Sequence, residues 1–311
     1  VDFVLPPEKI AEEISRIAEH PFAMEEQAKK ASDEVEADGI ADKGDALQEI
    51  LLLVRNQSRV DFSLYRVNTI RRRIMRRMVL AQIKELSEYA NYLRHNPPEL
   101  AVLYQDLLIA VTGFFRNPET FEALKKKVFP KLLKGRSADD EMRVWVIGCS
   151  TGQEAYSIAM AFLEYSSGVS QNVRLQLFAT DLNEVLLEKA RAGLYPKSLV
   201  QDVSGERLRR FFIKEDGGYR ISKTVREMCI FAQQNIVTDP PFSRMDLISC
   251  RNLLIYLEPE LQRKVIPTFH YALKPEGFLV LGLSESIGML SSRFAPVDKK
   301  LKIFSKKPGN P

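Results

Sequence analysis

The sequence predicts an α/β fold in which a doubly wound, largely parallel sheet follows an all-helical domain and contains a small inserted β-subdomain. From about residue 120 onward, short apolar strands alternate with helices, which is typical of parallel sheets. Residues 45–118 show only helical patterns, and between 193 and 227 the alternation breaks around Asp216-Gly217-Gly218, which favours a hairpin. A chain of 311 residues is long for one compact domain, so two domains are expected.

The N-terminal part begins with residues 1–22, where a short extended piece precedes a helix that starts near Pro7. Its isoleucines recur at helical spacing on one face, at positions 10, 14 and 17. Residues 23–44 are acidic and alanine-rich without an apolar period, which predicts a linker. The N-terminal helical domain, residues 45–118, is expected to contain helices over 46–58, 62–80, 85–96 and 97–111.

The second domain is expected over residues 119–311 and opens with a helix at 120–134. Helices are also expected at 153–167 and 183–192. The apolar runs predict strands at 142–147, 173–180, 228–234, 245–250, 277–283 and 301–306. The irregular stretch at 193–227 is the predicted insert.

Composition excludes several classes of protein. A hydrophobic content of 45% supports a sizeable core. The three cysteines, at 149, 229 and 250, form no CxxC pair, which argues against a zinc site or a disulfide framework and favours a reducing compartment. The first residues lack a secretory pattern, and no apolar run approaches the roughly 20 residues that span a bilayer. A cytoplasmic protein without membrane insertion is therefore expected.

A glycine turn, VWVIGCSTGQEAYSIAM, joins the predicted strand 142–147 to the next helix. Gly148 and Gly152 let the backbone approach a ligand at the carboxyl edge of the sheet. A P-loop requires lysine where Gln153 stands, and the dinucleotide fingerprint GxGxxG is absent. Cys149 as a nucleophile lacks an evident base, because the histidines at 20, 95 and 270 lie away from this edge.

Two carboxylates suggest which ligand this edge binds. Glu154 begins the helix after the turn, where a negative charge suits an amine and repels phosphate. Asp181 ends the next strand, the position from which a carboxylate accepts ribose hydroxyls. A ligand with an ammonium group, a ribose and no phosphate is S-adenosylmethionine. The residues alone leave open that Glu154 is an ordinary first-turn acid or that a dinucleotide binds.

The segment 61–77 contains six arginines and one acid, so the net positive charge of this segment alone exceeds the net charge of +4 for the whole chain. Leu64, Val67, Ile70, Ile74 and Met78 recur at helical spacing and predict the buried stripe. The arginines then form a solvated face, a nucleic-acid site or a surface for an acidic protein. Few acids lie one helical turn from these arginines to offset their charge, which argues against a merely solvated face. The rest of the chain is not basic, which argues against a nucleic-acid site.

Several motifs together resemble the chemotaxis receptor methyltransferases (CheR family). They are DFSLYRVNTIRRRIMRRM, VTGFFRNPETF, WVIGCSTGQEAYSIAM, ATDLN and DLISCRNLLIYL, and the resemblance runs from about residue 45 to 305. It implies a Rossmann-like methyltransferase fold and transfer of a methyl group from S-adenosylmethionine to glutamate carboxylates of receptors. Residues 1–22 are similar to the C-terminal end of the partner methylesterase domain (CheB), which implies a fused methylesterase–methyltransferase protein.

The resemblance also implies roles for individual residues. Arg116 and Tyr256 are the expected catalytic residues, with Tyr256 near the transferred methyl group. The residues expected to bind the donor are Thr112, Arg116, Gly148, Glu154, Asp181, Asn235, Ile236, Arg251 and Asn252. The sequence departs from the family at Ala110, where asparagine is usual, and at GQEAYS, where the family usually has GEEPYS.

The chemistry needs no strong base, because a glutamate with a pKa near 4.3 is ionised at neutral pH. No metal is expected. A dry pocket helps because both charges disappear in the transition state, and Phe114 and Phe115 are either walls of that pocket or core residues.

The resemblance favours acidic receptor helices as partners of the basic helix, through Arg66, Arg72, Arg73, Arg76 and Arg77. A monomer that binds no nucleic acid is expected. Two alternatives remain: an S-adenosylmethionine-binding signalling or scaffold module without turnover, and an RNA methyltransferase.

Overall fold

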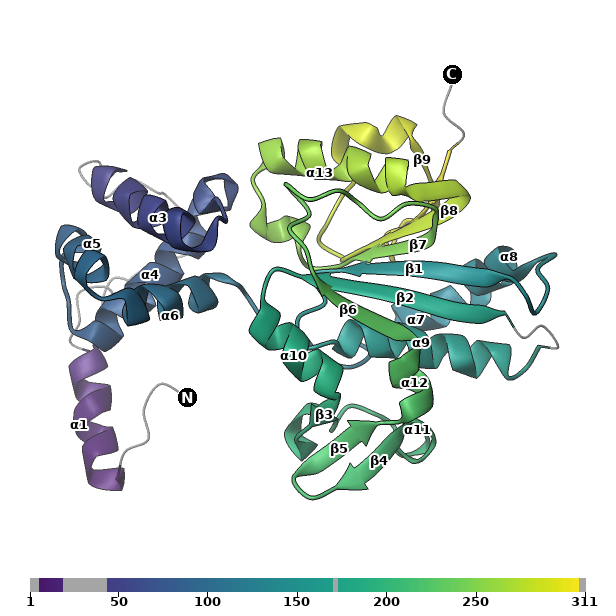
Figure 1. The fold of residues 1–311 in the computed structure, drawn as a ribbon, viewed down its shortest axis with the longest axis horizontal. Helices are drawn as coiled ribbons and strands as arrows, with labels where there is room; N and C mark the ends of the chain where they lie inside the picture. The colour runs from purple at the N-terminus through teal and green to yellow at the C-terminus, as the bar shows by residue number, and fades with distance from the viewer. Residues whose placement is uncertain (1–5, 19–43, 170–172, 308–311) are drawn as a thin grey trace. The chain divides into compact units, whose positions relative to one another are not determined.

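The computed structural model describes residues 6–18, 44–169 and 173–307, and the chain divides into two compact units between Ile109 and Ala110 (Figure 1). The predicted linker lies almost entirely outside the described residues, as do the two ends of the segment 1–22. Among the helices that the structure describes, none is long and apolar enough to cross a bilayer.

The first unit consists of helices: α1 (Pro7–Ala18), α3 (Gly44–Ser58), the 3₁₀ turn η1 (Phe62–Leu64), α4 (Val67–Ala81), α5 (Leu86–His95) and α6 (Pro97–Leu107). The junction of α5 and α6 follows from the sequence, because the Asn96 side chain accepts a hydrogen bond from the Glu99 amide and Pro97 occupies the first helical position. Fully buried side chains from these elements form the core: Ile50, Val54, Ile74, Met78, Tyr89 and Leu103.

The structure corrects two helix predictions in this unit. The predicted helix 62–80 is interrupted, because Asp61 caps η1 and the backbone of Arg66 is not helical, with φ −56° and ψ 115°. Val67 consequently opens α4 and is 50% exposed, whereas Ile70, Ile74 and Met78 are buried as predicted. The last helix ends at Leu107 and not at 111, since the β-branched residues that follow and then Gly113 are poor helix formers.

The second unit is built on a seven-stranded sheet with the order β6-β2-β1-β7-β8-β10-β9. Its strands are β1 (Glu141–Ile147), β2 (Arg174–Asp181), β6 (Cys229–Gln233), β7 (Met245–Cys250), β8 (Leu273–Leu281), β9 (Phe294–Asp298) and β10 (Ile303–Lys306). The first five strands in this order are parallel, and β10 runs antiparallel to both of its neighbours. The predicted α/β fold is confirmed.

Helices cover both faces of this sheet (Figure 1). One face carries α7 (Pro118–Ala123), the π-helical turn η2 (Leu124–Val128), α8 (Phe129–Leu133), α9 (Gln153–Ser166) and α10 (Glu184–Ala192). The other face carries α13 (Pro259–Ala272), which the sequence analysis did not predict, as it did not predict β9. The 3₁₀ turns η4 (Leu254–Tyr256) and η5 (Gly288–Ser292) connect the later elements.

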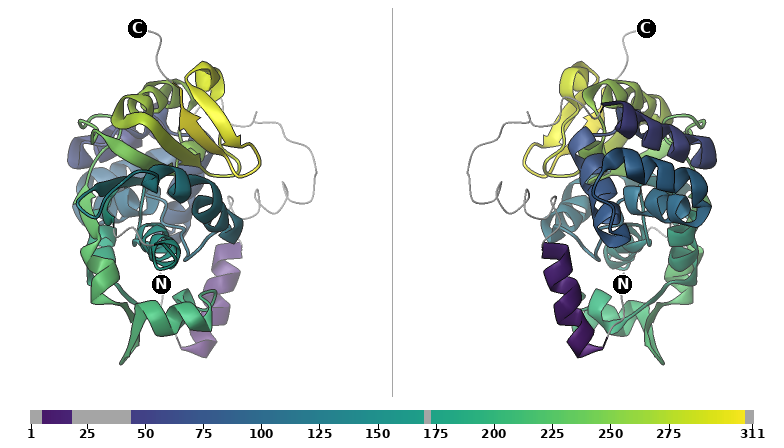
Figure 2. Two further views of the ribbon diagram at one scale, coloured as in Figure 1. Left: turned by 90° about the vertical axis from the view of Figure 1, so that its right-hand side faces the viewer. Right: turned by 90° about the vertical axis from the view of Figure 1, so that its left-hand side faces the viewer.

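The insert contains a three-stranded antiparallel sheet in the order β3-β5-β4. Its elements are β3 (Leu194–Tyr195), η3 (Lys197–Leu199), α11 (Gly205–Phe211), β4 (Phe212–Glu215), β5 (Gly218–Ile221) and α12 (Lys223–Glu227). The predicted hairpin is present between β4 and β5, where Gly217 has a φ of +92°. The insert lies on the other side of α9 from the main sheet (Figure 2).

The second unit begins at Ala110, nine residues before the predicted boundary of 119. Phe114 and Phe115 are 4% and 5% exposed and belong to the core that contains α9 and β1. The segment 110–117 is therefore held within the second unit through its own aromatic side chains.

Candidate functional site

The carboxyl ends of the parallel strands bring most of the predicted site residues to one edge of the sheet. Gly148 follows β1, Asp181 ends β2, Asn235 follows β6, and Arg251 follows β7. Open α/β sheets bind ligands at this edge, where the order of the strands reverses.

The glycine turn has the left-handed conformation that its sequence predicts. Gly148 and Gly152 have φ values of +68° and +91°. A Cβ atom added at Gly152 would lie 2.9 Å from the Cβ atom of Ala190 and 3.2 Å from the Phe231 ring. Both glycines are predicted to allow the approach of a ligand. At Gly152 the absence of a side chain also allows α10 and β6 to pack against the turn, and the approach of a ligand there stays a prediction.

Asp181 connects the glycine turn to the end of β2. Its Oδ2 accepts a hydrogen bond from the Ser150 amide at 2.7 Å, and its Oδ1 accepts one from the Asn183 amide at 2.9 Å. Burial raises the pKa of Asp181, although these amide hydrogen bonds oppose the shift. The Leu182 amide also hydrogen-bonds this carboxylate, which leaves about one of its four acceptor positions for a hydroxyl group.

Glu154 is paired with Arg251, a partner that the sequence analysis did not identify. The Arg251 Nη1 donates to Glu154 Oε2 at 2.7 Å and to Oε1 at 2.9 Å, and the Ser249 hydroxyl donates to Oε1 at 3.0 Å. The two side chains are 3% (Arg251) and 14% (Glu154) exposed. A carboxylate has about four acceptor positions, so one remains for an ammonium group.

Arg251 also holds the segment 110–117. Its Nη2 donates to the Arg116 carbonyl at 2.6 Å and to Asn117 Oδ1 at 3.0 Å. The Arg116 guanidinium is exposed and donates to the Val111 carbonyl at 3.2 Å, while Thr112 is half-buried. One buried guanidinium thus joins α9, the end of β7 and the segment that presents Arg116.

Phe114 and Phe115 are core residues. The Phe114 ring packs against Tyr195 and Phe212, and the Phe115 ring packs against Phe121. Of the two interpretations of these aromatic residues, walls of a reaction pocket or core, the structure supports the core. Cys149 is also buried, and burial raises the pKa of its thiol well above the usual range, which does not suit a nucleophile.

Glu285 is a buried carboxylate at this edge that the sequence analysis missed. It is 4% exposed and accepts hydrogen bonds from the amides of Gly282 at 2.6 Å, Asn252 at 3.0 Å and Ile255 at 3.3 Å. These bonds fix the turn in which Asn252 has a φ of +61° and which leads into Tyr256. The signal in the sequence is an acid placed just after a buried strand, in LGLSES.

Glu285→Gln is expected to lower turnover about tenfold or more while changing the free energy of unfolding by roughly 1 kcal/mol or less. Glutamine loses one of the two acceptor oxygens that hold the turn. Burial raises the pKa of Glu285, so a neutral side chain also removes a desolvation cost. Urea unfolding and steady-state kinetics measure the two effects. Asp246→Asn, at the opposite end of β7, is the control. A parallel loss of stability and turnover in Glu285→Gln would contradict the prediction.

The remaining predicted residues follow strands β6 and β7 at this edge. Tyr256 and Ile236 are half-buried. The Asn235 side chain accepts a hydrogen bond from the Val237 amide at 3.0 Å, and the Asn235 amide donates to Asp239 at 2.8 Å, so these residues form a local turn after β6. Their contact with a ligand stays a prediction.

The arginines of the basic helix do not all share one exposed face. Arg66, Arg72 and Arg76 are exposed, and Arg73 is half-buried. Arg77 forms a two-pronged ion pair with Glu99, with Nη2 at 2.7 Å from Oε2, and its side chain is only 14% exposed. The prediction that Arg77 binds a receptor is therefore corrected: its partner Glu99 lies on α6, and the helical spacing within α4 could not reveal it.

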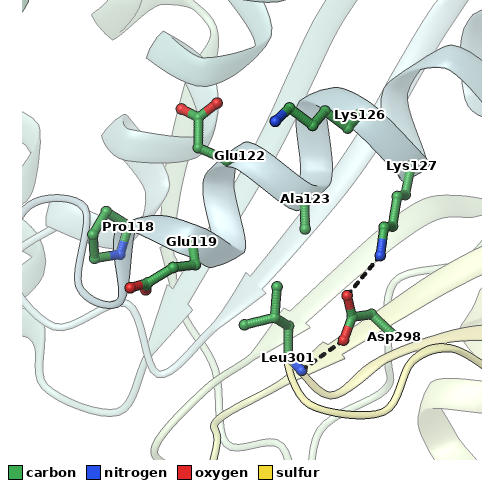
Figure 3. A pocket seen from close by; sticks show the side chains of 8 residues that line it. All are labelled: Pro118, Glu119, Glu122, Ala123, Lys126, Lys127, Asp298 and Leu301. Carbon is green, nitrogen blue, oxygen red and sulfur yellow. Dashed lines mark hydrogen bonds and ion pairs between the residues drawn. The ribbon is translucent and has the colours of Figure 1, made fainter.

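The described residues contain no group of three or more His, Cys, Asp or Glu that could hold a metal ion. The pocket in Figure 3 has a volume of about 380 Å³ and lies between α7, η2 and the turn that joins β9 to β10. Ala123 and Leu301 line it, with the ion pair of Lys127 and Asp298 at its rim. None of the predicted site residues lines this pocket.

The sheet edge has the chemical groups that an adenosylmethionine ligand needs. Two carboxylates, Glu154 and Asp181, flank the glycine turn. Three buried polar atoms at this edge have no hydrogen-bond partner within the described part of the chain: Ser150 Oγ, Gln234 Oε1 and Arg251 Nε. Acidic groups and unused polar atoms fit a ligand that carries an amine and a sugar, and they do not fit a triphosphate.

Comparisons with known proteins agree with this reading of the edge. Residues 110–303 match the family model described as the CheR methyltransferase, SAM binding domain, and residues 45–108 match the CheR methyltransferase, all-alpha domain. The chain is 32% identical over 221 residues to chemotaxis protein methyltransferase 1 of Pseudomonas aeruginosa, covering 69% of this chain and 80% of that protein. It is 31% identical over 229 residues to chemotaxis protein methyltransferase 2 of Vibrio cholerae, covering 72% and 79%.

A longer relative is also similar. The chain is 37% identical over 267 residues to an uncharacterised 104.1 kDa protein of Rhodobacter capsulatus, which covers 86% of this chain but only 28% of that protein. The two domain matches follow one another along the chain and include both the helical unit and the carboxyl edge described above. The chain therefore belongs to the CheR methyltransferase family, and it is an S-adenosylmethionine-dependent methyltransferase of that family.

Proposed function

We propose that the protein methylates glutamate carboxylates of chemotaxis receptors. The observation that carries the proposal is the pair of carboxylates, Glu154 and Asp181, on either side of the glycine turn at the carboxyl edge of a CheR-family sheet. The names of the relatives in Pseudomonas aeruginosa and Vibrio cholerae support a role in chemotaxis.

The proposed donor site uses the residues that reach this edge. Glu154 receives the ammonium group and Asp181 receives the ribose, while Asn235 and Ile236 flank the adenine. When bound, the donor supplies a methyl group on a positively charged sulfur. Thr112, Arg116, Gly148 and Asn252 complete the site, and Arg251 acts by fixing Glu154 and the backbone at Arg116.

The chain's contribution to the reaction is orientation and exclusion of water. A substrate glutamate is already ionised at neutral pH, so no side chain has to remove a proton. Two opposite charges are partly neutralised in the transition state, and water stabilises the separated ions more than that state. Arg116 orients the site, and the Tyr256 hydroxyl orders the reacting groups by hydrogen bonding.

The exposed arginines of α4 are the proposed receptor surface, without Arg77. Arg72→Glu is expected to weaken binding to receptor membranes about three- to tenfold at low salt, because receptor methylation helices are acidic. In 0.5 M salt, the electrostatic screening length falls to roughly 4–5 Å. The difference in receptor binding between Arg72→Glu and wild type is then expected to disappear. Sedimentation with receptor membranes measures this, and Lys264→Glu on α13 is the control. Equal binding by Arg72→Glu and wild type at low salt would contradict the proposal.

The experiment for the proposed function uses labelled S-adenosylmethionine and receptor membranes. Methyl esters release labelled methanol in mild base, whereas N-methyl groups do not. Release of labelled methanol supports glutamate methylation. Donor binding without any transfer favours a module without turnover, an alternative that Ala110, standing where the family has asparagine, supports.

A further inference from the structure

Tyr195, in β3 of the insert, touches two segments of the proposed donor site, the glycine turn and the segment 110–117. Its side chain is 2% exposed, and its hydroxyl donates to the Thr151 carbonyl of the glycine turn at 2.6 Å. Its ring meets Phe114 edge-on, with the ring centres 4.9 Å apart. Burial raises the pKa of Tyr195 well above its usual value, so the phenol remains a donor at any physiological pH.

The backbone of the insert fixes the position of Tyr195. A Cβ atom added at Gly218 would lie only 2.1 Å from the Tyr195 carbonyl oxygen, which means that β5 lies directly against β3 at this point. The backbone of Tyr195 therefore cannot move without a shift of the three-stranded sheet. From this backbone, the Tyr195 side chain reaches the Thr151 carbonyl and the Phe114 ring.

Arg207, on α11 of the insert, holds the segment 110–117 from another side. Its guanidinium lies 3.7 Å from the centre of the Phe115 ring. Two hydrogen bonds of 2.5 and 2.9 Å to Glu164 on α9 hold the guanidinium in this position over the ring. Phe115 has a φ of +50°, and its amide donates to the Ser157 hydroxyl at 2.9 Å.

From these contacts we infer that the insert positions the donor-binding segments, with Tyr195 and Arg207 as its positioning residues. Tyr195 sets the glycine turn through Thr151, and Arg207 sets the left-handed Phe115, one residue before Arg116. The inference rests on the proposed donor site, but it does not depend on which substrate receives the methyl group. Neither residue needs to touch the donor.

Tyr195→Phe and Tyr156→Phe form a matched pair that tests the first contact. Tyr156 is 1% exposed, and its hydroxyl donates to the Ala190 carbonyl on α10 at 2.7 Å, so each variant removes one buried hydrogen bond to a backbone carbonyl. Tyr195→Phe is expected to raise the Kd for adenosylhomocysteine about three- to tenfold, the effect of one hydrogen bond. Tyr156→Phe is expected to leave that Kd within about twofold of wild type.

Arg207→Met and Arg220→Met form a second pair. Arg220 makes a two-pronged ion pair with Glu215, at 2.6 and 2.7 Å, and donates to the Ala192 carbonyl. It therefore resembles Arg207 in its ion pair but does not stack on Phe115. Only Arg207→Met is expected to weaken donor binding. Arg207→Lys, which keeps the charge near Glu164 and loses the flat guanidinium, is expected to resemble Arg207→Met.

Two measurements on the full chain test the inference. Calorimetric titration with adenosylhomocysteine gives the Kd of each variant, and thermal unfolding gives its Tm. Equal losses of Tm within each pair, with weaker binding only in the Tyr195 and Arg207 variants, support the inference. Wild-type Kd values in both of these variants would overturn it. A wild-type protein that binds adenosylhomocysteine but forms no methyl ester would contradict the proposed substrate and leave this inference standing, whereas no binding by wild type would overturn both.

Discussion

Arg251→Met is expected to abolish measurable binding of adenosylhomocysteine and to destabilise the second unit by about 3–5 kcal/mol. The Arg251 side chain is 3% exposed and compensates the charge of Glu154, so its removal leaves a buried carboxylate without its cation. The Arg116 carbonyl and Asn117 would also lose their donor, which would release the segment 110–117. Urea unfolding and calorimetry measure the two losses.

Two further variants separate the ion pair from general damage. The double variant Arg251→Met/Glu154→Gln is expected to recover part of the stability without recovering binding, because the uncompensated charge is gone. Lys264→Met removes the cation of an exposed pair with Glu260 on α13, and its cost is expected to stay within about 1 kcal/mol. A single variant Arg251→Met as stable as Lys264→Met would show that the buried pair does not hold this edge together.

Arg116→Ala is expected to lower kcat by about 10²–10³ while the fold remains intact, the usual effect of removing one oriented polar group from a reaction site. The guanidinium is exposed, and its hydrogen bond to the Val111 carbonyl is local, so little stability depends on it. Tyr256→Phe is expected to lower methyl transfer in the same way. Rates of methanol release and circular dichroism measure the two effects.

The control for these variants is Arg174→Ala, an exposed arginine at the beginning of β2 and thus at the opposite edge of the sheet. It is expected to turn over like wild type. If Arg116→Ala and Tyr256→Phe also kept wild-type rates, both residues would be removed from the mechanism.

Much of the sheet could be predicted because buried parallel strands are short apolar runs with clear limits. β7, whose six residues are all buried, is predicted to the residue, and the hairpin of the insert follows from its two glycines. β9 was missed because it is a short strand at the edge with a proline at 296, a pattern that resembles a loop. The break in the basic helix depends on Asp61, whose capping role the helical spacing concealed.

The site was predictable only where a residue acts through its neighbours in the chain. The glycine turn and Asp181 show in the sequence because each lies at a strand end, and Glu154 shows because it lies in the first turn of the helix that follows the glycine turn. Their partners do not show: Arg251 reaches Glu154 from 97 residues away, and Glu99 reaches Arg77 from 22 residues away. Glu285, 33 residues from Asn252, was missed for the same reason.

Base-labile release of labelled methanol from receptor membranes, incubated with the protein and labelled S-adenosylmethionine, tests whether the protein forms glutamate methyl esters with this donor site. We expect labelled methanol with wild type and a loss of that signal with Asp181→Ala and Glu154→Ala. Base-stable label, label in nucleic acid, or undiminished methanol release by both carboxylate variants would contradict this expectation.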